Sequence, residues 1–185
     1  YINQCYSMTE LAGYGLLNVT QEGDHLRALG KPDGFCEVKV DETGEICVRG
    51  GCVMLGYYKD PEATAETIDK DGWLHTGDLA RVDEEGYYYM TGRKKNLIIL
   101  DSGENVSPEE LEGIVGKCEA VKECVVKEMG KKIGVVVYCD EDKQQQVRDF
   151  ITEANRTLPL YKRMSAVEFS TEPLPRNGAG KLLRQ

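Results

Sequence analysis

The sequence predicts a small β-rich, barrel-like subdomain over residues 1–92, followed by a compact α+β carboxyl-terminal domain over residues 93–185. Short alternating segments separated by glycine-containing turns occupy the first part, and they are typical of antiparallel strands. A helix-start signature follows only after residue 100, and from there helical and strand-like patterns alternate. The change of pattern places the domain boundary within residues 91–96.

The first part contains segments in which apolar and polar residues alternate, namely FCEVKV, EICVRG, LARV and YYYM. The turn sequences DETG and DEEG separate them in pairs, which predicts antiparallel hairpins. Glycines recur closely from Gly30 to Gly56, and this spacing suits a small curved sheet or barrel better than it suits helices.

The second part begins its first helix after Ser107, where SPEE combines a capping box with a proline at the first helical position. Two strands are predicted over residues 121–127 and 133–139. A second amphipathic helix over residues 147–158 ends before Pro159. The predicted order is strand, helix, strand, strand, helix, strand.

The seven cysteines are scattered singly, without a C-x-x-C pair. The histidines, His25 and His75, do not lie near any cysteine at the spacing of a metal site. We therefore expect reduced, mostly buried thiols of a cytoplasmic protein, with neither a disulfide framework nor a cysteine-bound metal.

The charge balance disfavours two classes of partner. Thirty-two acidic residues against 23 basic residues give a net charge of −9, which repels nucleic acid and anionic membrane surfaces. Apolar runs stay well short of the roughly 20 residues that span a bilayer, so no transmembrane segment is predicted. A nucleotide site remains compatible with this charge if a few cations gather locally.

Two short segments combine groups that suit a nucleotide. Residues Tyr6–Glu10, YSMTE, bring together an aromatic ring, hydroxyls and a carboxylate, although alone they favour a turn or a helix start capped by Thr9. Asp78 follows Gly77 in WLHTGD, where its carboxylate could accept hydrogen bonds from both hydroxyls of a ribose. Such charge-assisted bonds contribute about 1.5–3 kcal/mol each. The alternative is an aspartate that caps a turn.

Two further segments carry cations. GRKKN gathers Arg93, Lys94 and Lys95 at the predicted boundary, either as a solvated linker or as a contact for an anionic ligand. PRNGAGK ends in Lys181, whose ammonium on a glycine-rich loop is suited to reach a phosphate. This is not a P-loop, because Leu182 stands where that motif has a hydroxyl residue.

Taken in order, seven stretches are far more specific than any one of them: YSMTE, GEICVRG, GYYKDPEATAET, DGWLHTGDLA, GRKKNLII, SGENVSPEELE and PRNGAGK. In this order they resemble the later motifs of the adenylate-forming superfamily, which comprises acyl-CoA synthetases, peptide-synthetase adenylation domains and luciferases. The resemblance covers nearly the whole chain. The third and fifth stretches most resemble those of fatty acyl-CoA synthetases.

The resemblance implies a site for ATP and Mg²⁺ formed by the first part of the chain. Tyr6 would stack on adenine, and Thr9 would lie near the phosphates. Glu10 would help to hold Mg²⁺, which bridges phosphate oxygens. Asp78 would bind the ribose hydroxyls, with Arg93 beside it.

The resemblance also implies two half-reactions, in which a carboxylic acid is first adenylated and a thiol, that of coenzyme A, then attacks the acyl carbon. Lys181 would be the catalytic lysine of the first step. Lys95 would be the hinge about which the carboxyl-terminal domain swings. Ser102, Gly103 and Glu104 would then line the approach of the thiol.

The family's upstream phosphate loop, rich in Ser, Thr and Gly, is not found in the sequence, and the larger upstream region that shapes the acyl pocket is missing too. We therefore expect residues 1–92 to be the end of a larger amino-terminal domain, which would be a partner of this chain. The absence of methionine at position 1 favours a fragment. Because several phosphate donors are lost, the chain alone is predicted to be inactive.

Ser7 and Ser102 occupy positions where the family commonly has glycine, which bears on the acyl pocket and on the thiol path, respectively. Three alternatives stay open. The parent protein could be an aryl-acid ligase, or a peptide-synthetase adenylation domain whose acceptor is a carrier-protein thiol. The chain could also be a non-catalytic module that binds an adenine nucleotide or a partner.

Overall fold

The computed structural model describes residues 3–13, 15–19, 23–178 and 180–184. It contains two compact units, residues 1–95 and 96–185, each with its own buried core. The predicted boundary lies between residues 92 and 93, whereas the units divide after Lys95. Within the described part of the chain, none of the helices has both the length and the apolar character that crossing a membrane requires.

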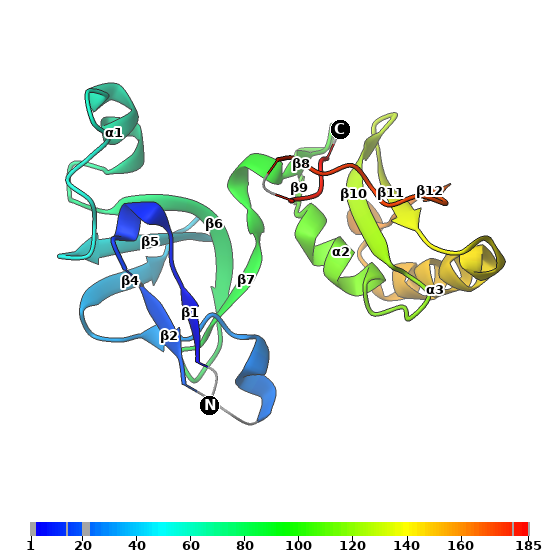
Figure 1. Cartoon of the computed structure of the whole chain (residues 1–185), viewed down its shortest axis with the longest axis horizontal. Coiled ribbons are helices and arrows are strands. Elements are labelled where there is room, and N and C mark those ends of the chain that lie inside the picture. Colours follow the sequence, from blue (N-terminus) through cyan, green and yellow to red (C-terminus); the bar gives the residue numbers. More distant parts are fainter. Residues whose placement is uncertain (1–2, 14, 20–22, 179, 185) are drawn as a thin grey trace. The chain divides into compact units, whose positions relative to one another are not determined.

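The first unit contains two antiparallel sheets (Figure 1). The smaller sheet has the order β1 (Gln4–Tyr6), β2 (Leu16–Asn18), β3 (Lys31–Pro32). The larger sheet has the order β4 (Cys36–Val40), β5 (Glu45–Gly50), β6 (Leu74–Val82), β7 (Tyr88–Arg93). Short 3-10 turns lie at Thr9–Leu11, Gly23–Arg27 and Lys94–Asn96.

One core joins the two sheets, because Leu11 and Leu16 pack with Ile46, Val48 and Leu74 of the larger sheet, and none of these five side chains is exposed. Gly30 brings the sheets into close approach through a bridge to Tyr88. Its φ is +117°, and a Cβ there would lie 2.2 Å from the Leu17 carbonyl carbon, so only glycine fits. The β-rich, barrel-like character predicted for this region is confirmed.

Helix α1 (Pro61–Thr67) interrupts the β structure of the first unit and was not predicted. Asp60 caps its start by accepting a hydrogen bond from Ala63 N at 3.0 Å, and Pro61 follows in the first turn. The signal that sequence reasoning missed is the pair Asp60-Pro61. Such a pair can begin a helix, although it also occurs in turns.

The second unit is an α+β unit, as predicted. Strands β8 (Ile98–Ile99) and β9 (Asn105–Val106) form a hairpin. A three-stranded sheet has the order β10 (Glu123–Met129), β11 (Lys132–Tyr138), β12 (Ala166–Ser170), with β12 parallel to β11. The helices are α2 (Pro108–Val115) and α3 (Gln144–Thr157), and 3-10 turns lie at Glu141–Lys143 and Leu160–Lys162.

Both predicted helices of this unit begin and end close to their sequence signals. Ser107 Oγ accepts a hydrogen bond from Glu110 N, so the predicted cap of α2 is confirmed. Leu111 and Val115 on α2, with Val147 and Ile151 on α3, are buried in the core of the unit. The predicted order of strands and helices is also confirmed, with β9 as an additional short strand.

The expectation that all cysteines are free is wrong for Cys36 and Cys52, which form a disulfide. Cys36 begins β4 opposite Gly50, and Cys52 lies just beyond the end of β5, so the hairpin returns the second cysteine to the first. Their separation along the chain resembles no metal or redox motif, which is why sequence reasoning missed the pair. Among the described residues, the free cysteines are Cys5, Cys47, Cys118, Cys124 and Cys139.

Candidate functional site

A cavity of about 380 Å³ lies at the ends of β6 and β7 in the first unit. It is lined by Thr76, Gly77, Asp78, Arg93, Lys94 and Lys95. The lining thus combines one carboxylate with several cations, although the chain as a whole is acidic. A local cationic surface of this kind favours an anionic ligand that also carries hydroxyl donors.

Asp78 is the centre of this cavity wall. It pairs directly with Arg93 across β6 and β7, and its side chain is 6% exposed. Its Oδ2 accepts a hydrogen bond from Tyr6 Oη at 2.8 Å. Its Oδ1 lies 2.8 Å from Arg93 Nε, yet no described donor meets Oδ1 with hydrogen-bond geometry. Oδ1 is therefore buried and has an ion contact with Arg93, but it accepts no hydrogen bond from a described residue.

The part of β6 before Asp78 is held by contacts of the Thr76 hydroxyl. Thr76 Oγ1 donates to the Ile46 carbonyl at 2.8 Å and accepts from Asp78 N at 3.1 Å. Gly77 has a φ of +73°, which turns the chain between them. The carboxylate is therefore held on a rigid turn.

Tyr6 ends β1 and is 7% exposed. Burial, followed by the influence of the Asp78 carboxylate, raises the pKa of the Tyr6 hydroxyl, so it remains a donor at neutral pH. Its ring forms part of the core of the unit, while its hydroxyl is directed at the site.

Glu10 belongs to a second cavity of about 460 Å³. Its Oε1 accepts a hydrogen bond from Tyr57 Oη at 2.8 Å, and this bond raises the pKa of Tyr57. Its backbone carbonyl accepts from Met54 N at 2.8 Å. Thr9 lies in the same 3-10 turn and is exposed. The cavity is lined by Met8, Glu10, Glu45, Tyr57, Glu66, Thr67, His75, Thr76, Gly77 and Lys94.

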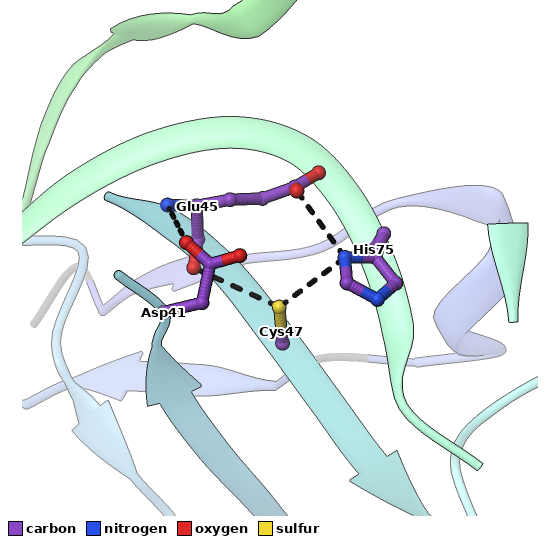
Figure 2. Close-up of side chains that lie close together, drawn as sticks. All are labelled: Asp41, Glu45, Cys47 and His75. Carbon is purple, nitrogen blue, oxygen red and sulfur yellow. Dashed lines mark hydrogen bonds and ion pairs between the residues drawn. The ribbon is translucent and has the colours of Figure 1, made fainter. Parts of the chain in front are cut away.

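A group that the sequence did not predict lies beside these cavities. Asp41, Glu45, Cys47 and His75 bring their side-chain ligand atoms within 4.8 Å of one another (Figure 2). His75 is not at ligand spacing from a cysteine along the sequence, but β5 and β6 pair it directly with Cys47. The register of the sheet creates a contact between residues that sequence spacing keeps apart.

Glu45 is almost fully buried in this group. Burial raises the pKa of its carboxyl, but hydrogen bonds from Lys94, Gly77 and His75 outweigh burial and hold the pKa below its ordinary value. Lys94 Nζ lies 2.9 Å from Glu45 Oε2. Burial also raises the pKa of the Cys47 thiol to about 11, with Asp41 and Glu45 adding to the shift.

The boundary residue Lys95 is exposed and lies in the 3-10 turn Lys94–Asn96. In the second unit, Ser102, Gly103 and Glu104 form the exposed turn of the β8–β9 hairpin. Gly103 has a φ of +92°, and its amide donates to the Leu100 carbonyl at 2.8 Å. A Cβ at Gly103 would meet no atom within 4 Å, so this turn leaves open space around its backbone.

Lys181 lies on the closing side of a tight turn in the second unit. Its amide donates to Asn177 Oδ1 at 3.0 Å, and its carbonyl accepts from Asn177 N at 2.8 Å. Its side chain is exposed. Ala179, within the predicted motif, lies outside the described residues.

Arg176 anchors this turn. One guanidinium nitrogen donates to the Gly180 carbonyl at 2.6 Å, and the other lies 2.6 Å from Glu123 Oε1 on β10. Glu123 Oε2 accepts from Leu174 N at 2.8 Å. The turn is therefore attached to the sheet while the Lys181 ammonium remains accessible, a tether that sequence reasoning did not anticipate.

Of the predicted residues, the structure brings Tyr6, Asp78 and Arg93 into direct contact. Lys95 lines the same cavity as Asp78 and Arg93, and Glu10 lines the neighbouring one. The remaining predicted residues belong to the second unit, on the β8–β9 turn and on the turn that carries Lys181.

Residues 95–185 match a family model described as an AMP-binding enzyme C-terminal domain. A long-chain-fatty-acid–CoA ligase of Escherichia coli O157:H7 is 36% identical over 200 residues, which cover 100% of this chain and 35% of the ligase. A 4-coumarate–CoA ligase of Solanum tuberosum is 36% identical over 162 residues, covering 83% of this chain and 29% of that protein.

Among solved structures, an o-succinylbenzoate CoA synthetase of Bacillus subtilis in complex with its acyl-adenylate intermediate superposes with a TM-score of 0.81 and 31% sequence identity. The match covers 98% of this chain and 40% of that one. The same synthetase in complex with ATP and a magnesium ion gives a TM-score of 0.79 at 30% identity. This chain thus spans well under half the length of the relatives that it matches.

Proposed function

Residues 95–185 belong to the family of AMP-binding enzyme C-terminal domains, and from this premise we propose that the chain is part of an ATP-dependent carboxylate:CoA ligase. In this function a carboxylic acid attacks the α-phosphate of ATP, which gives an acyl-adenylate and pyrophosphate. The thiol of coenzyme A then attacks the acyl carbon and releases AMP. The first unit contributes nucleotide contacts, and the second contributes the catalytic lysine.

The observation that carries the proposal is the buried carboxylate of Asp78 beside a cationic cavity. Its Oδ1 has no hydrogen-bond donor among the described residues, and a ribose hydroxyl would supply one. Tyr6 and Arg93 hold the carboxylate in place from either side. We propose that Asp78 binds the ribose and that Arg93 lies beside it, while Tyr6, whose ring is buried in the core, supports Asp78 through its hydroxyl.

Glu10, which lines the neighbouring cavity, and Thr9, which lies beside it in the same 3-10 turn, are proposed to face the phosphates. The donor chemistry fits Mg²⁺, because this ion prefers carboxylate and phosphate oxygens and is often held by only one or two carboxylates. Glu10 keeps one carboxylate oxygen beyond the one bonded to Tyr57. When bound, Mg²⁺ would neutralise charge on the phosphate oxygens.

In the second unit, Lys181 is proposed as the catalytic residue of adenylation. Its ammonium would stabilise the negative charge that develops between the carboxylate and the α-phosphate. The anchored turn restricts the path of the lysine without covering its side chain. For the second half-reaction we propose that the unit rotates about Lys95 and presents Ser102, Gly103 and Glu104 to the pantetheine thiol.

We propose a fatty acid as the carboxylic acid, supported by the long-chain-fatty-acid–CoA ligase among the relatives. A similarly identical relative acts on 4-coumarate, so an aryl acid is the competing substrate class. The acid pocket of the parent protein, and its remaining phosphate contacts, would be formed by the larger amino-terminal region. The chain alone is therefore proposed to lack adenylation activity.

Carboxylate-dependent exchange of pyrophosphate into ATP tests the proposal. The chain is compared with a version extended upstream through the phosphate loop, using fatty and aryl acids in parallel. We expect exchange only in the extended protein, a loss on Lys181→Ala, and no loss on Lys132→Ala, which removes another exposed lysine of the same unit. Absence of exchange with every acid would favour a nucleotide-binding module without catalysis.

A further inference from the structure

The geometry points to a binding site for a thiophilic divalent cation of the Zn²⁺ class in the first unit, formed by Asp41, Glu45, Cys47 and His75 (Figure 2). None of these residues is assigned a role in the proposed ligase reaction, so the inference stands apart from it. The set combines thiolate, imidazole and carboxylate donors, which is the ligand chemistry that Zn²⁺ prefers.

The distances fit a tetrahedral cation. His75 Nδ1 lies 3.6 Å from Cys47 Sγ and 3.2 Å from Glu45 Oε2. Ligands at ordinary zinc bond lengths and tetrahedral angles lie about 3.3–3.6 Å apart. All four ligand atoms lie within 4.8 Å of one another, so small side-chain rotations would bring the other pairs of ligand atoms to tetrahedral distances.

Hydrogen bonds orient the carboxylates of Glu45 and Asp41 toward this centre. Gly77 N donates to Glu45 Oε1 at 2.8 Å, which leaves Oε2 facing His75. Asp41 Oδ1 accepts from Thr43 N, Thr43 Oγ1 and Glu45 N at 2.7–2.9 Å. The second oxygen of Asp41 is therefore the one that remains for a cation.

A second, independent feature is the environment of the other imidazole nitrogen. His75 Nε2 faces Asp69 Oδ2 at 3.6 Å, and Asp69 Oδ1 accepts from Trp73 N at 2.9 Å. A carboxylate behind a histidine is the arrangement that fixes the tautomer of metal-binding histidines and makes them more basic. It leaves Nδ1 as the coordinating atom.

The site is accessible, and it already attracts a cation. Glu45 and His75 line the second cavity, and the His75 side chain is 34% exposed. Lys94 Nζ lies 2.9 Å from Glu45 Oε2, and its side chain is 51% exposed. A divalent cation would displace this flexible ammonium into solvent. Replacing Lys94 should therefore strengthen metal binding, which an adventitious surface site has no reason to show.

The test is titration of the chain with Co²⁺, which adopts zinc-like sites and gives a thiolate-to-metal charge-transfer absorption, followed by displacement with Zn²⁺. We expect one equivalent to bind with this absorption. Cys47→Ser should abolish the band, while Cys5→Ser, which changes an exposed free cysteine elsewhere, should leave it intact. Asp69→Asn should weaken binding about 10- to 100-fold. Lys94→Gln should strengthen it severalfold.

Circular dichroism of each variant establishes that it is folded. A charge-transfer band that persists in Cys47→Ser and disappears in Cys5→Ser would overturn the assignment, as would the absence of any band in the folded wild-type chain. Unchanged affinity in both Asp69→Asn and Lys94→Gln would mean that Co²⁺ does not occupy this centre.

Discussion

Asp78 illustrates how much a single residue depends on its neighbours. A buried carboxylate is costly unless it is compensated, and here one oxygen receives a neutral hydroxyl while the other has only an ion contact. This incomplete satisfaction is the reason that Asp78 is proposed as a ligand-binding group.

We predict that Asp78→Asn weakens AMP binding by about 1.5–3 kcal/mol in the upstream-extended protein, because one charge-assisted bond to the ribose is lost. Tyr6→Phe keeps the ring and should cost only about 1 kcal/mol. Isothermal titration calorimetry measures both. An equal loss of AMP-binding free energy in the two variants would mean that the effect comes from the Tyr6–Asp78 hydrogen bond and not from a ribose contact.

The cysteines should differ sharply in reactivity. Cys5 is exposed, whereas Cys47 is buried with its thiol pKa raised to about 11 and Cys124 is half-buried with its pKa raised to about 12, chiefly by burial. Because only the thiolate is nucleophilic, alkylation at pH 8 should modify Cys5 first. Mass spectrometry of peptides gives the order, and rapid modification of Cys124 would contradict it.

At the scale of single residues, the sequence predicted candidate site residues that belong to local motifs. It missed residues that come together only when strands pair. Asp78 and Lys181 stand next to glycines in recognisable stretches. Cys47 and His75 share no motif, and only the register of β5 and β6 brings them together. The Cys36–Cys52 pair was missed for the same reason.

At the scale of elements, the sequence predicted the helices of the second unit well, because capping and periodicity agree there. Helix α1 has a cap but lacks the periodicity, since it has no buried residue and therefore no apolar face to recognise. Its cap alone identifies it, and an Asp-Pro pair is typical of turns as well as of helix starts.

The cap of α2 gives a direct test of this local signal. Ser107→Ala should destabilise the start of the helix by about 1 kcal/mol, because Glu110 N loses its side-chain acceptor. Hydrogen exchange of α2 peptides should accelerate accordingly. Ser165→Ala, in the same unit but outside any helix, serves as the control and should leave α2 protection unchanged.

The anchor of the Lys181 turn should be pH-dependent. Arg176 lowers the pKa of Glu123 below its ordinary value of 4.5, with the Leu174 amide as the next cause. A depressed carboxyl pKa contributes stability above pH 4.5, and that contribution is lost as pH falls through the lower folded value. Carboxyl ¹³C titration should show the depression, and Arg176→Gln should remove most of it. Identical titrations would exclude the ion pair as its cause.

On the scale of the whole molecule, the chain consists of two compact units that follow one another along the sequence. Each unit has its own sheets and its own core, and the sheet pairing of the first unit ends at Arg93. Sequence reasoning located this change of character from the switch between strand and helix patterns. The division after Lys95 depends on contacts that composition alone does not reveal.

Independent cores predict independent unfolding. Leu111→Ala removes a fully buried side chain and should cost the second unit about 2–5 kcal/mol. Hydrogen exchange should therefore accelerate in β10, β11 and α3 while β5 and β6 keep their protection. Leu74→Ala should give the reverse pattern. Acceleration throughout the chain in either variant would show that the units unfold together.

The pairing of Asp78 with Arg93 has a consequence for recombination between homologous genes. The last sheet contact of the first unit lies only two positions before Lys95, so a crossover placed after Lys95 would keep the β6–β7 pair from one parent. The second unit would arrive from the other parent with its core and its Arg176–Glu123 tether intact. Hybrids joined there should fold, whereas a crossover inside β7 would take Asp78 and its partner Arg93 from different parents.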